Sequence, residues 1–291
     1  MSTFPTLSIH QFDAQGLEHQ FYVNTFTEHL RKHHASILHP HKHDFYLTVL
    51  FTHGSGFHEI DFQRFEVIPG AVFFLQPGQT HHWEFSAAVE GFIFFHSATY
   101  YQLNFPHQRL ADFPFLYSRN DIPTLQLLSD EITAFSKQFE ELLEEFTHAK
   151  SHKYQKIASL LNCLYIDLSR CYVEQHAVLK DVTHRYSHKF EAFETLVNEQ
   201  YITQKSAAFY ADQLNIGTKH LNRICKESSG KTSTEFIMER VILEAKRLLS
   251  SDQHNLTEIA LVLGFEEYAY FSRLFKQYCH ESPRDFRQRY Y

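Results

Sequence analysis

The sequence predicts an α+β multidomain protein, in which a strand-rich N-terminal β-sandwich or β-barrel with following helices precedes an all-α C-terminal part. Two observations lead to this prediction. Over the first ~110 residues, short aromatic and β-branched runs alternate with turn signals at intervals of about ten residues. From Thr124 onward, apolar residues recur at spacings of three and four, which is typical of amphipathic helices. A chain of 291 residues is also long enough for two domains.

The predicted strands lie between turns rich in glycine and proline. They are Phe45–Phe51, Phe57–Phe62, Ala71–Leu75 and a strand that follows Pro77-Gly78. Because the turns are so evenly spaced, an all-β arrangement is favoured over alternating βα units. We therefore expect a barrel domain over residues 1–120.

Two long helices are expected after the barrel. The first follows an apolar stripe from Leu125 to Phe146, and the second runs from about Lys153 to Glu174. The pair, residues 121–175, either covers the barrel or forms a self-association surface. Residues 176–187 are polar and lack periodicity, so we expect a linker there, followed by an all-helical domain over residues 188–291.

The net charge of −7 argues at first against a nucleic-acid partner, because such proteins usually carry a basic excess. The charge is unevenly distributed, however. Residues 1–184 carry 12 basic and 20 acidic side chains, whereas residues 185–291 carry 15 and 14. The acidity therefore belongs to the N-terminal part, which also holds 18 of the 22 histidines.

Cysteine usage and hydropathy predict a cytoplasmic protein. The four cysteines have no CxxC spacing, which argues against a zinc knuckle and against a disulfide framework, and a reducing compartment fits them best. The N-terminal residues lack the pattern of an export signal. No apolar run approaches the ~18 residues that a membrane-spanning helix requires, so we expect no membrane partner.

An internal repeat marks the C-terminal part. Residues Ala211–Lys226 and Ala260–Lys276 each contain an Ala, a turn of small residues and then an Arg-x-x-Lys pattern, at an offset of 49 to 50 residues. A short helix, a tight turn and an amphipathic helix are the components of a helix-turn-helix unit. Asn215, Gly217 and Gly264 are residues that tolerate the positive φ that such a turn can require.

Further signals define helix ends in this part. Thr218 is expected to cap the second helix of the first unit. Thr232-Ser-Thr-Glu235 has the pattern of a capping box that opens a long connecting helix. Ser282-Pro283-Arg284-Asp285 opens the last helix with a cap residue and a proline at the first position.

The second helix of each unit has an outward face that is suited to DNA. Because helix-turn-helix proteins place this face in the major groove, its polar residues become candidates for base contacts. Arginine bonds guanine bidentately and asparagine does the same for adenine. The candidate DNA-binding residues are Lys219, Asn222, Arg223, Tyr268, Ala269, Ser272 and Arg273.

At this point the residues resemble a known family. Ile259–Arg287 is similar almost throughout to the C-terminal signature of the AraC/XylS family of bacterial transcription regulators. The resemblance implies two helix-turn-helix units joined by a rigid helix, and it places the seven candidate residues at the bases. Tyr268 and Ala269 stand where more polar residues are common in the family. This difference implies a weaker base-reading role and a stronger backbone-positioning role for the second unit.

Three histidines form a second candidate site. His41 and His43 lie two apart in a predicted strand and so share a face, and His81 approaches from a neighbouring strand. Three imidazoles suit Zn, Fe, Cu or Ni. The three histidines can equally line an effector pocket or be hydrogen-bonded structural groups. We expect other histidines, such as His29, to be solvated.

The surrounding segments resemble the cupin-like sensor domain of AraC-type regulators. In metal-dependent cupin enzymes, a glutamate ligand follows the two histidines, but Leu47 and Thr48 hold those places here. We therefore assign no metal, cofactor or catalytic residue from the sequence. The predicted effector-binding residues are His41, His43, Phe45, His81 and Trp83.

The sequence thus predicts a sequence-specific transcription regulator and not an enzyme. Its expected partners are promoter DNA, RNA polymerase, a small-molecule effector and a second copy in a homodimer. Activation is the mode that the family resemblance favours. The alternatives are a metal-dependent cupin enzyme or metal sensor fused to a DNA-binding domain, and a regulator without a ligand. The effector, which could be an aromatic compound or a sugar, and the operator are not specified.

Overall fold

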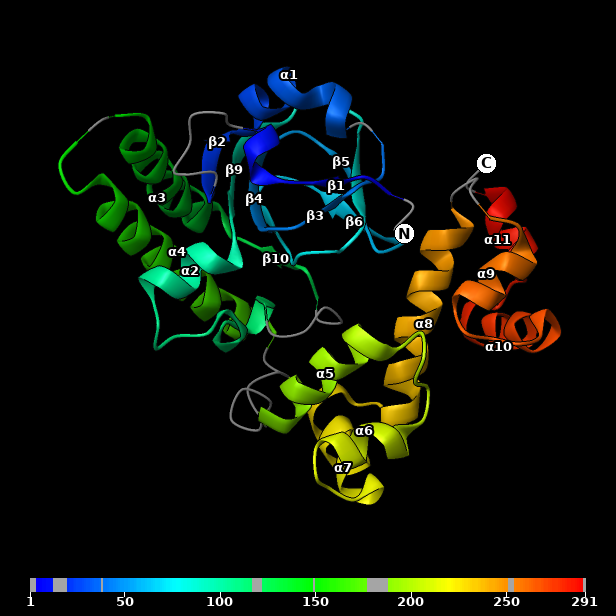
Figure 1. Cartoon of the computed structure of the whole chain (residues 1–291). Coiled ribbons are helices and arrows are strands. Elements are labelled where there is room, and N and C mark those ends of the chain that lie inside the picture. Colours follow the sequence, from blue (N-terminus) through cyan, green and yellow to red (C-terminus); the bar gives the residue numbers. More distant parts are fainter. Residues whose placement is uncertain are drawn as a thin grey trace. The chain divides into compact units, whose positions relative to one another are not determined.

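The computed structural model describes residues 4–12, 20–37, 39–116, 122–148, 150–176, 188–250 and 254–289 (Figure 1). The chain divides into two compact units. The N-terminal unit is Pro5–Ala177, and the main part of the C-terminal unit is Val178–Tyr291. Each unit is described by itself. Most of the predicted linker at 176–187 lies outside the described residues.

The N-terminal unit is rich in strands. A five-stranded sheet has the order β10-β7-β4-β9-β2, a three-stranded sheet has the order β6-β5-β8, and β1 pairs with β3 in parallel. The strands are β1 Thr6–Leu7, β2 Phe21–Thr25, β3 Lys42–His43, β4 Tyr46–His53, β5 Gly56–Ile60, β6 Gln63–Val67, β7 Ala71–Leu75, β8 His81–Phe85, β9 Glu90–His96 and β10 Thr124–Gln126. The predicted α+β fold is confirmed, although the described strands form separate sheets and not one closed barrel.

The strand-rich region also contains helices that the sequence pattern did not predict. They are α1 Phe26–Ile37, α2 Ala98–Asn104 and the short 3-10 helices η1 Ile9–Gln11, η3 Leu110–Asp112 and η4 Pro114–Leu116. Strand β6 was missed as well, because a tight two-residue turn joins it to β5. The turn residues Asp61 and Phe62 both have positive φ, 46° and 68°. A Phe at such a position gives no turn signal in the sequence.

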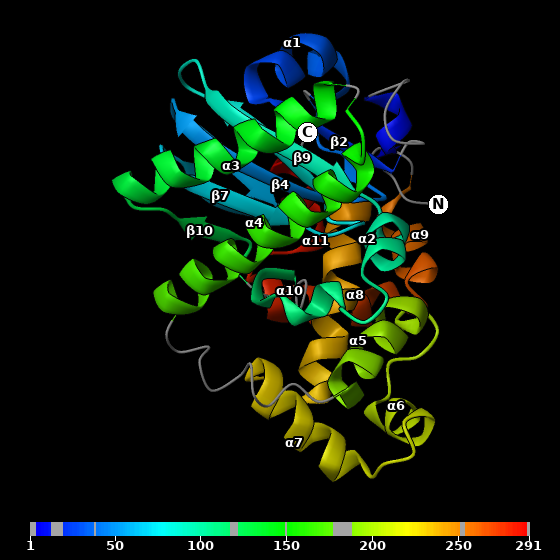
Figure 2. The same ribbon diagram turned by 90° about the vertical axis from the view of Figure 1, so that its left-hand side faces the viewer.

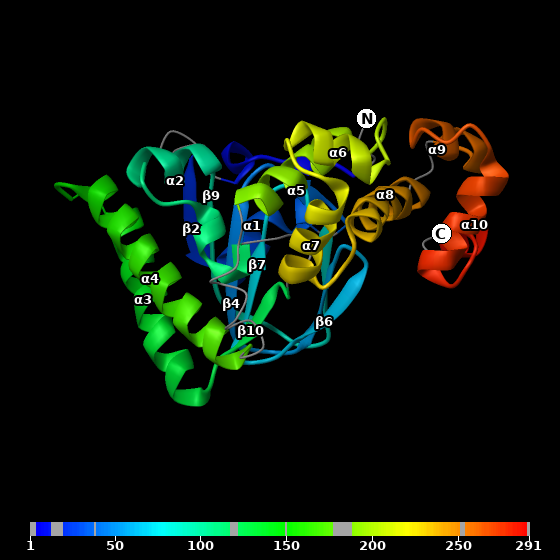
Figure 3. The ribbon, with the colours of Figure 1, turned by 90° about the horizontal axis from the view of Figure 1, so that it is seen from below.

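Two long helices cover one face of the five-stranded sheet (Figures 2 and 3). They are α3 Ser129–Thr147 and α4 Lys153–Gln175. Phe139 of α3 contacts the rings of Phe92 and Phe94 of β9 at 5.7 and 5.6 Å. The helical pattern from Thr124 is wrong in its first turn, because residues 124–126 pair with β7 as strand β10. The helix pair lies in the same compact unit as the sheets.

The core of this unit lies on the opposite face of the sheet. Alternate residues of a strand face opposite sides, so Phe95 and Ile93 point inward while Phe92 and Phe94 meet the helices. The inward side chains join Phe45, Phe51 and other buried residues of β4, β7 and β8 in one apolar cluster. The histidines described below lie at the edge of this cluster.

The C-terminal unit is entirely helical in its described residues. Its helices are α5 His188–Gln200, α6 Ala207–Gln213, α7 Thr218–Ser229, α8 Ser233–Leu249, α9 Leu256–Val262, α10 Tyr268–Cys279 and α11 Pro283–Arg289. Helix α8 extends from the α6–α7 pair to the α9–α11 group (Figure 1). No helix among the described residues of either unit is long and apolar enough to cross a membrane.

The helix-end predictions are confirmed with one exception. The capping box Thr232–Glu235 opens α8, and the Ser282 hydroxyl accepts the backbone N–H of Asp285 at the start of α11. Thr218, however, is the first helical residue of α7, and Gly217 is its N-cap. Gly217 has φ −75°, so the first turn does not use the positive φ that a glycine tolerates at this position.

Candidate functional site

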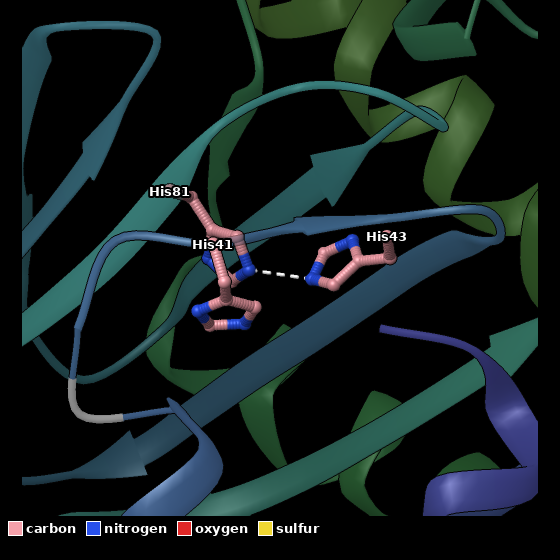
Figure 4. A group of neighbouring side chains, drawn as sticks. All are labelled: His41, His43 and His81. Carbon is pink, nitrogen blue, oxygen red and sulfur yellow. Dashed lines mark hydrogen bonds between the residues drawn. The ribbon is translucent and has the colours of Figure 1, made fainter. Parts of the chain in front are cut away.

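The structure brings the three predicted histidines together (Figure 4). One ring nitrogen from each of His41, His43 and His81 lies within 4.8 Å of those of the other two. The cause is strand pairing: the backbones of His41 and His81 exchange hydrogen bonds of 3.1 and 2.9 Å in an antiparallel bridge. Side chains at directly opposed positions share one face of the sheet. His43 follows two residues after His41 and points to the same side.

A fourth histidine belongs to this group. His58 of β5 is fully buried, and its Nε2 lies 2.9 Å from Nδ1 of His81. On the other side, Nε2 of His81 lies 2.5 Å from Nε2 of His43. His58 was missed because it stands alone on its strand. Pairing β5 with β8 would have located it, since His58 is opposite Trp83 in the observed register.

All four imidazoles are neutral at physiological pH. Burial lowers the pKa of His41 to about 4, and it holds the pKa values of His43, His58 and His81 well below their ordinary value. The physical cause is the loss of water around the charged form, with repulsion between neighbouring imidazolium ions as a second contribution. Neutral imidazole is also the form that binds metal ions.

The other two predicted effector residues adjoin this group. The Phe45 ring is stacked on the His43 ring at 4.5 Å, and the Trp83 ring lies 4.6 Å from His81 and 4.9 Å from His58. The Trp83 indole N–H is buried and has no hydrogen-bond partner among the described residues. The five predicted residues therefore form one contiguous region with His58.

One histidine prediction is wrong. His29 of α1 is buried and not solvated, and its Nδ1 lies 3.1 Å from the Tyr22 hydroxyl. Burial lowers its pKa to about 3. Helix α1 packs against β2 and β9, which turns this side chain away from solvent.

In the C-terminal unit, the two helix-turn-helix units have the same turn geometry. In the first turn, the N–H of Ile216 donates to the carbonyl of Ala211 at 3.0 Å, and in the second the N–H of Phe265 donates to Ala260 at 2.9 Å. The equivalent residues Asn215 and Gly264 have φ of 53° and 74°. The positive φ predicted for these two positions is confirmed.

The repeat extends further than its sequence motif. Thr232 and Ser282 are equivalent N-caps fifty residues apart, and the C-caps Gly230 and His280 both have positive φ, 72° and 60°. The unit that is repeated therefore includes the start of the helix that follows each pair. Sequence identity is low at these positions because caps tolerate several residue types.

The second helices of the two helix-turn-helix units, α7 and α10, present the predicted outward residues unequally. Lys219, Arg223, Ala269 and Arg273 are exposed, whereas Tyr268 and Ser272 are half-buried. Arg223 and Arg273 occupy equivalent positions, and within the described residues neither forms a hydrogen bond or an ion pair. Leu221, Cys225, Phe271 and Phe275 are buried on the opposite faces, as the helical spacing predicts.

Asn222 differs from the other six residues. It is half-buried, and its Oδ1 accepts both the backbone N–H of Ser233 at 2.9 Å and the Ser233 hydroxyl at 2.7 Å. Bidentate recognition of adenine requires this same oxygen. Asn222 is therefore engaged within the unit, where it ties α7 to the first turn of α8.

Comparisons with known proteins match both units. Residues 26–164 match the model of the AraC-like ligand binding domain, and residues 210–289 match that of a helix-turn-helix domain. The HTH-type transcriptional activator RhaS of Escherichia coli is 22% identical over 259 residues, which cover 85% of this chain and 87% of RhaS.

Among solved structures, ToxT from Vibrio cholerae covers 92% of this chain and 98% of its own at 15% identity and a TM-score of 0.43. The C-terminal domain of the response regulator yesN from Fusobacterium nucleatum is 25% identical and covers 35% of this chain and 99% of its own, with a TM-score of 0.33. The two family models, in this order along the chain, correspond to the strand-rich and the helical unit. The chain therefore resembles transcription regulators of the AraC type, with a region similar to the AraC-like ligand binding domain followed by one similar to a helix-turn-helix domain.

Proposed function

We propose that this protein is an effector-responsive activator of transcription that works as a homodimer in the cytoplasm. The observation that carries the proposal is the equivalent placement of Arg223 and Arg273. Both are exposed on the second helix of a helix-turn-helix unit and have no hydrogen-bond or ion-pair partner among the described residues, and an arginine placed there can reach the major groove. Activation, and with it contact with RNA polymerase, is supported by the similarity to RhaS, which is described as a transcriptional activator.

The two helix-turn-helix units contribute different contacts to DNA recognition. Lys219 and Arg223 read bases or phosphates from α7, and Arg273 does so from α10. Ala269 is exposed but has no polar group, so it contributes at most an apolar contact, such as that with a thymine methyl. Tyr268 and Ser272 are half-buried, and they act mainly by positioning α10 on the sugar-phosphate backbone of the DNA. Asn222 has a structural role through Ser233.

The N-terminal unit receives the effector at the region formed by His41, His43, Phe45, His81 and Trp83. This region is largely apolar, but it contains buried polar atoms, such as Trp83 Nε1 and His43 Nδ1, that have no hydrogen-bond partner in the part of the chain that the structure describes. A polar ligand that hydrogen-bonds such atoms recovers free energy lost on burial. Burial lowers the pKa values of these histidines well below neutrality, which makes a binding role more suitable than a general acid–base role, because such chemistry needs a group that titrates near neutral pH.

The homodimer is proposed to form through the outer surface of α3 and α4. These helices use their apolar faces to cover the sheet, so only the outward positions remain for a partner. Effector binding would then shift the population of two dimer arrangements.

The test combines three measurements on the full chain. Selection from random duplexes identifies a preferred DNA sequence, sedimentation determines the oligomeric state, and a metabolite thermal-shift screen identifies the effector. A ligand at ~100 times its Kd is expected to stabilise the fold by about 2.7 kcal/mol. Failure to enrich any sequence would contradict DNA-specific recognition. A monomer that still binds its selected DNA with full affinity would contradict the dimer, and no shift with any metabolite would favour a regulator without a ligand.

A further inference from the structure

Four buried imidazoles from three segments of the chain converge in the N-terminal unit. His41, His43, His58 and His81 are each at most 2% exposed. The ring centroid of His81 lies 4.4 Å from those of His41 and His43, the three residues drawn in Figure 4. It lies 5.1 Å from the ring centroid of His58. His81 is therefore the centre of the group. Buried polar atoms normally have hydrogen-bond partners, so each ring nitrogen of this group should have one.

Hydrogen bonds among the histidines do not satisfy the group. His58, His81 and His43 form a chain with two N···N contacts, and each neutral ring carries a single N–H. Whichever way the two N–H groups point along the chain, one terminal Nδ1 is left as a buried donor and the other as a buried acceptor. Both terminal atoms, His43 Nδ1 and His58 Nδ1, indeed lack a partner among the described residues.

The hydrogen bonds of His41 and His81 to groups outside the set of three determine which of their ring nitrogens have a lone pair available for a metal ion. His41 Nδ1 lies 2.9 Å from the carbonyl oxygen of His39, and since a carbonyl only accepts, this nitrogen carries the proton. The Nε2 of His41 is then a free lone pair. His81 Nδ1 can likewise donate to His58 Nε2, which frees its own Nε2. Imidazoles that bind metal ions are oriented by this kind of N–H bond on the far side of the ring.

We propose that His41, His43 and His81 bind a divalent transition-metal ion through their Nε2 atoms, and that His58 positions His81 from behind. The ligand set contains imidazoles and no carboxylate, which suits Zn²⁺, Cu²⁺, Ni²⁺ or Fe²⁺ and disfavours Mg²⁺ and Ca²⁺. Three histidines leave a fourth position of a tetrahedral ion open. The proposal adds an inorganic ligand to the sensor domain and does not depend on how the C-terminal unit reads DNA.

Binding would change one observed contact. The Nε2 atoms of His43 and His81 are 2.5 Å apart. Two ligands of a tetrahedral Zn²⁺ with bonds of about 2.0–2.1 Å lie ~3.3 Å apart. The two rings must therefore separate by a little under an ångström. The ion takes the place of the proton between them, and His43 stays neutral by carrying that proton on its Nδ1 instead. Leu47 and Thr48 are both buried and offer no carboxylate, so the protein would supply no further anionic ligand from that strand.

Trp83 provides a built-in reporter. It is the single tryptophan of the chain, and its ring lies 4.6 Å from the His81 ring. A bound Co²⁺ or Ni²⁺ quenches nearby indole fluorescence, and tetrahedral Co²⁺ has strong visible absorption. Both signals are independent of DNA binding and of any organic effector.

The experiment uses the full chain without an affinity tag, stripped of metal with a chelator and dialysed. Co²⁺ alone is added while Trp83 fluorescence and visible absorption are recorded, and Zn²⁺ is then added in competition. We expect one equivalent of Co²⁺ per chain, quenching of Trp83, a tetrahedral absorption spectrum, and displacement by Zn²⁺. A folded wild-type chain that binds no stoichiometric Co²⁺ or Zn²⁺ would overturn the proposal without any variant.

Variants locate the site. His41→Ala, His43→Ala and His81→Ala should each abolish stoichiometric binding, while His58→Asn should weaken it by about 10–100-fold as loss of an orienting group does. His82→Ala is the matched control, because the neighbouring His82 lies near Glu59 and Glu84 instead of the cluster. Circular dichroism and a cooperative melt establish that each variant is folded. Retention of full affinity in the folded variants of the three ligands would place the metal elsewhere and refute the assignment.

Discussion

The side-chain oxygen of Asn222 accepts two hydrogen bonds from Ser233, one from its backbone N–H and one from its hydroxyl. Fifty residues later in the repeat, Ser272 takes the place of Asn222 and Pro283 that of Ser233. Proline has no N–H to donate. The two helix-turn-helix units are therefore joined to their following helices in different ways, although their turns are the same.

Asn222→Ala is expected to destabilise the C-terminal unit by ~1–2 kcal/mol, because it removes the acceptor of two hydrogen bonds and leaves the N–H of the buried Ser233 unsatisfied. Chemical denaturation gives the free energy of unfolding. Ser272→Ala is the matched control and should cost less than about 0.5 kcal/mol. If the substitution of Asn222 instead left stability unchanged and altered the preferred DNA sequence, the residue would be a base reader after all.

Arg223→Ala should weaken binding to the selected duplex by ~1–3 kcal/mol, and it should relax the preference at one base pair. Binding to random DNA should change far less. Fluorescence anisotropy with both duplexes measures the two effects. Arg64→Ala, which also removes one positive charge but from the N-terminal unit, serves as the control and should alter neither. Equal losses of binding free energy on selected and random DNA would show that Arg223 contacts a phosphate and not a base.

Gly264→Ala is expected to destabilise the second helix-turn-helix unit by about 2 kcal/mol or more. Gly264 has φ +74°, and an added Cβ would lie 2.3 Å from the carbonyl oxygen of Ile202. Gly217→Ala is the control, since Gly217 has negative φ and nothing within 4 Å of the Cβ position. Thermal melts of both variants test this, and equal melting temperatures would contradict the requirement for glycine in the second turn.

The stability of the N-terminal unit should fall in acid because of His96. This buried ring donates from Nδ1 to the carbonyl of Ser97, so its Nε2 accepts from the Tyr165 hydroxyl at 2.7 Å. Burial lowers the pKa of His96 to about 4, from about 6.5 when unfolded. The unfolded chain thus takes up the proton first, and the contribution of His96 is complete above pH ~6.5 and falls as the pH drops toward 4.

The loss assigned to His96 amounts to about 3 kcal/mol at pH ~4. Urea unfolding between pH 8 and 4 should therefore show a shallower pH dependence for His96→Asn than for the wild type. The exposed His107 supplies the comparison variant, His107→Asn, whose pH dependence should match the wild type. A His96→Asn profile parallel to that of the wild type would show that this ring is not responsible.

Several features of the fold were predictable because their signals are local. The turn residues Asn215 and Gly264, the capping box at Thr232 and the period of the buried faces of α7 and α10 all depend on neighbours within a few residues. Where local signals were ambiguous, prediction failed. The Asp61-Phe62 turn lacks glycine, and residues 124–126 continue a helical apolar pattern although they pair with β7.

In the candidate sites, too, the features with local signals could be predicted from the sequence, and those that depend on tertiary contacts could not. The outward positions of Arg223 and Arg273, and the face shared by His41 and His43, could be predicted from the residue pattern, because helical and strand periods dictate which side chains point together. That His58 joins the histidine group, that His29 is buried and that Asn222 is held by Ser233 became clear from the folded chain alone. These outcomes depend on which strands pair and which helices pack. Such contacts join residues far apart in the chain or in different elements, and no local pattern records them.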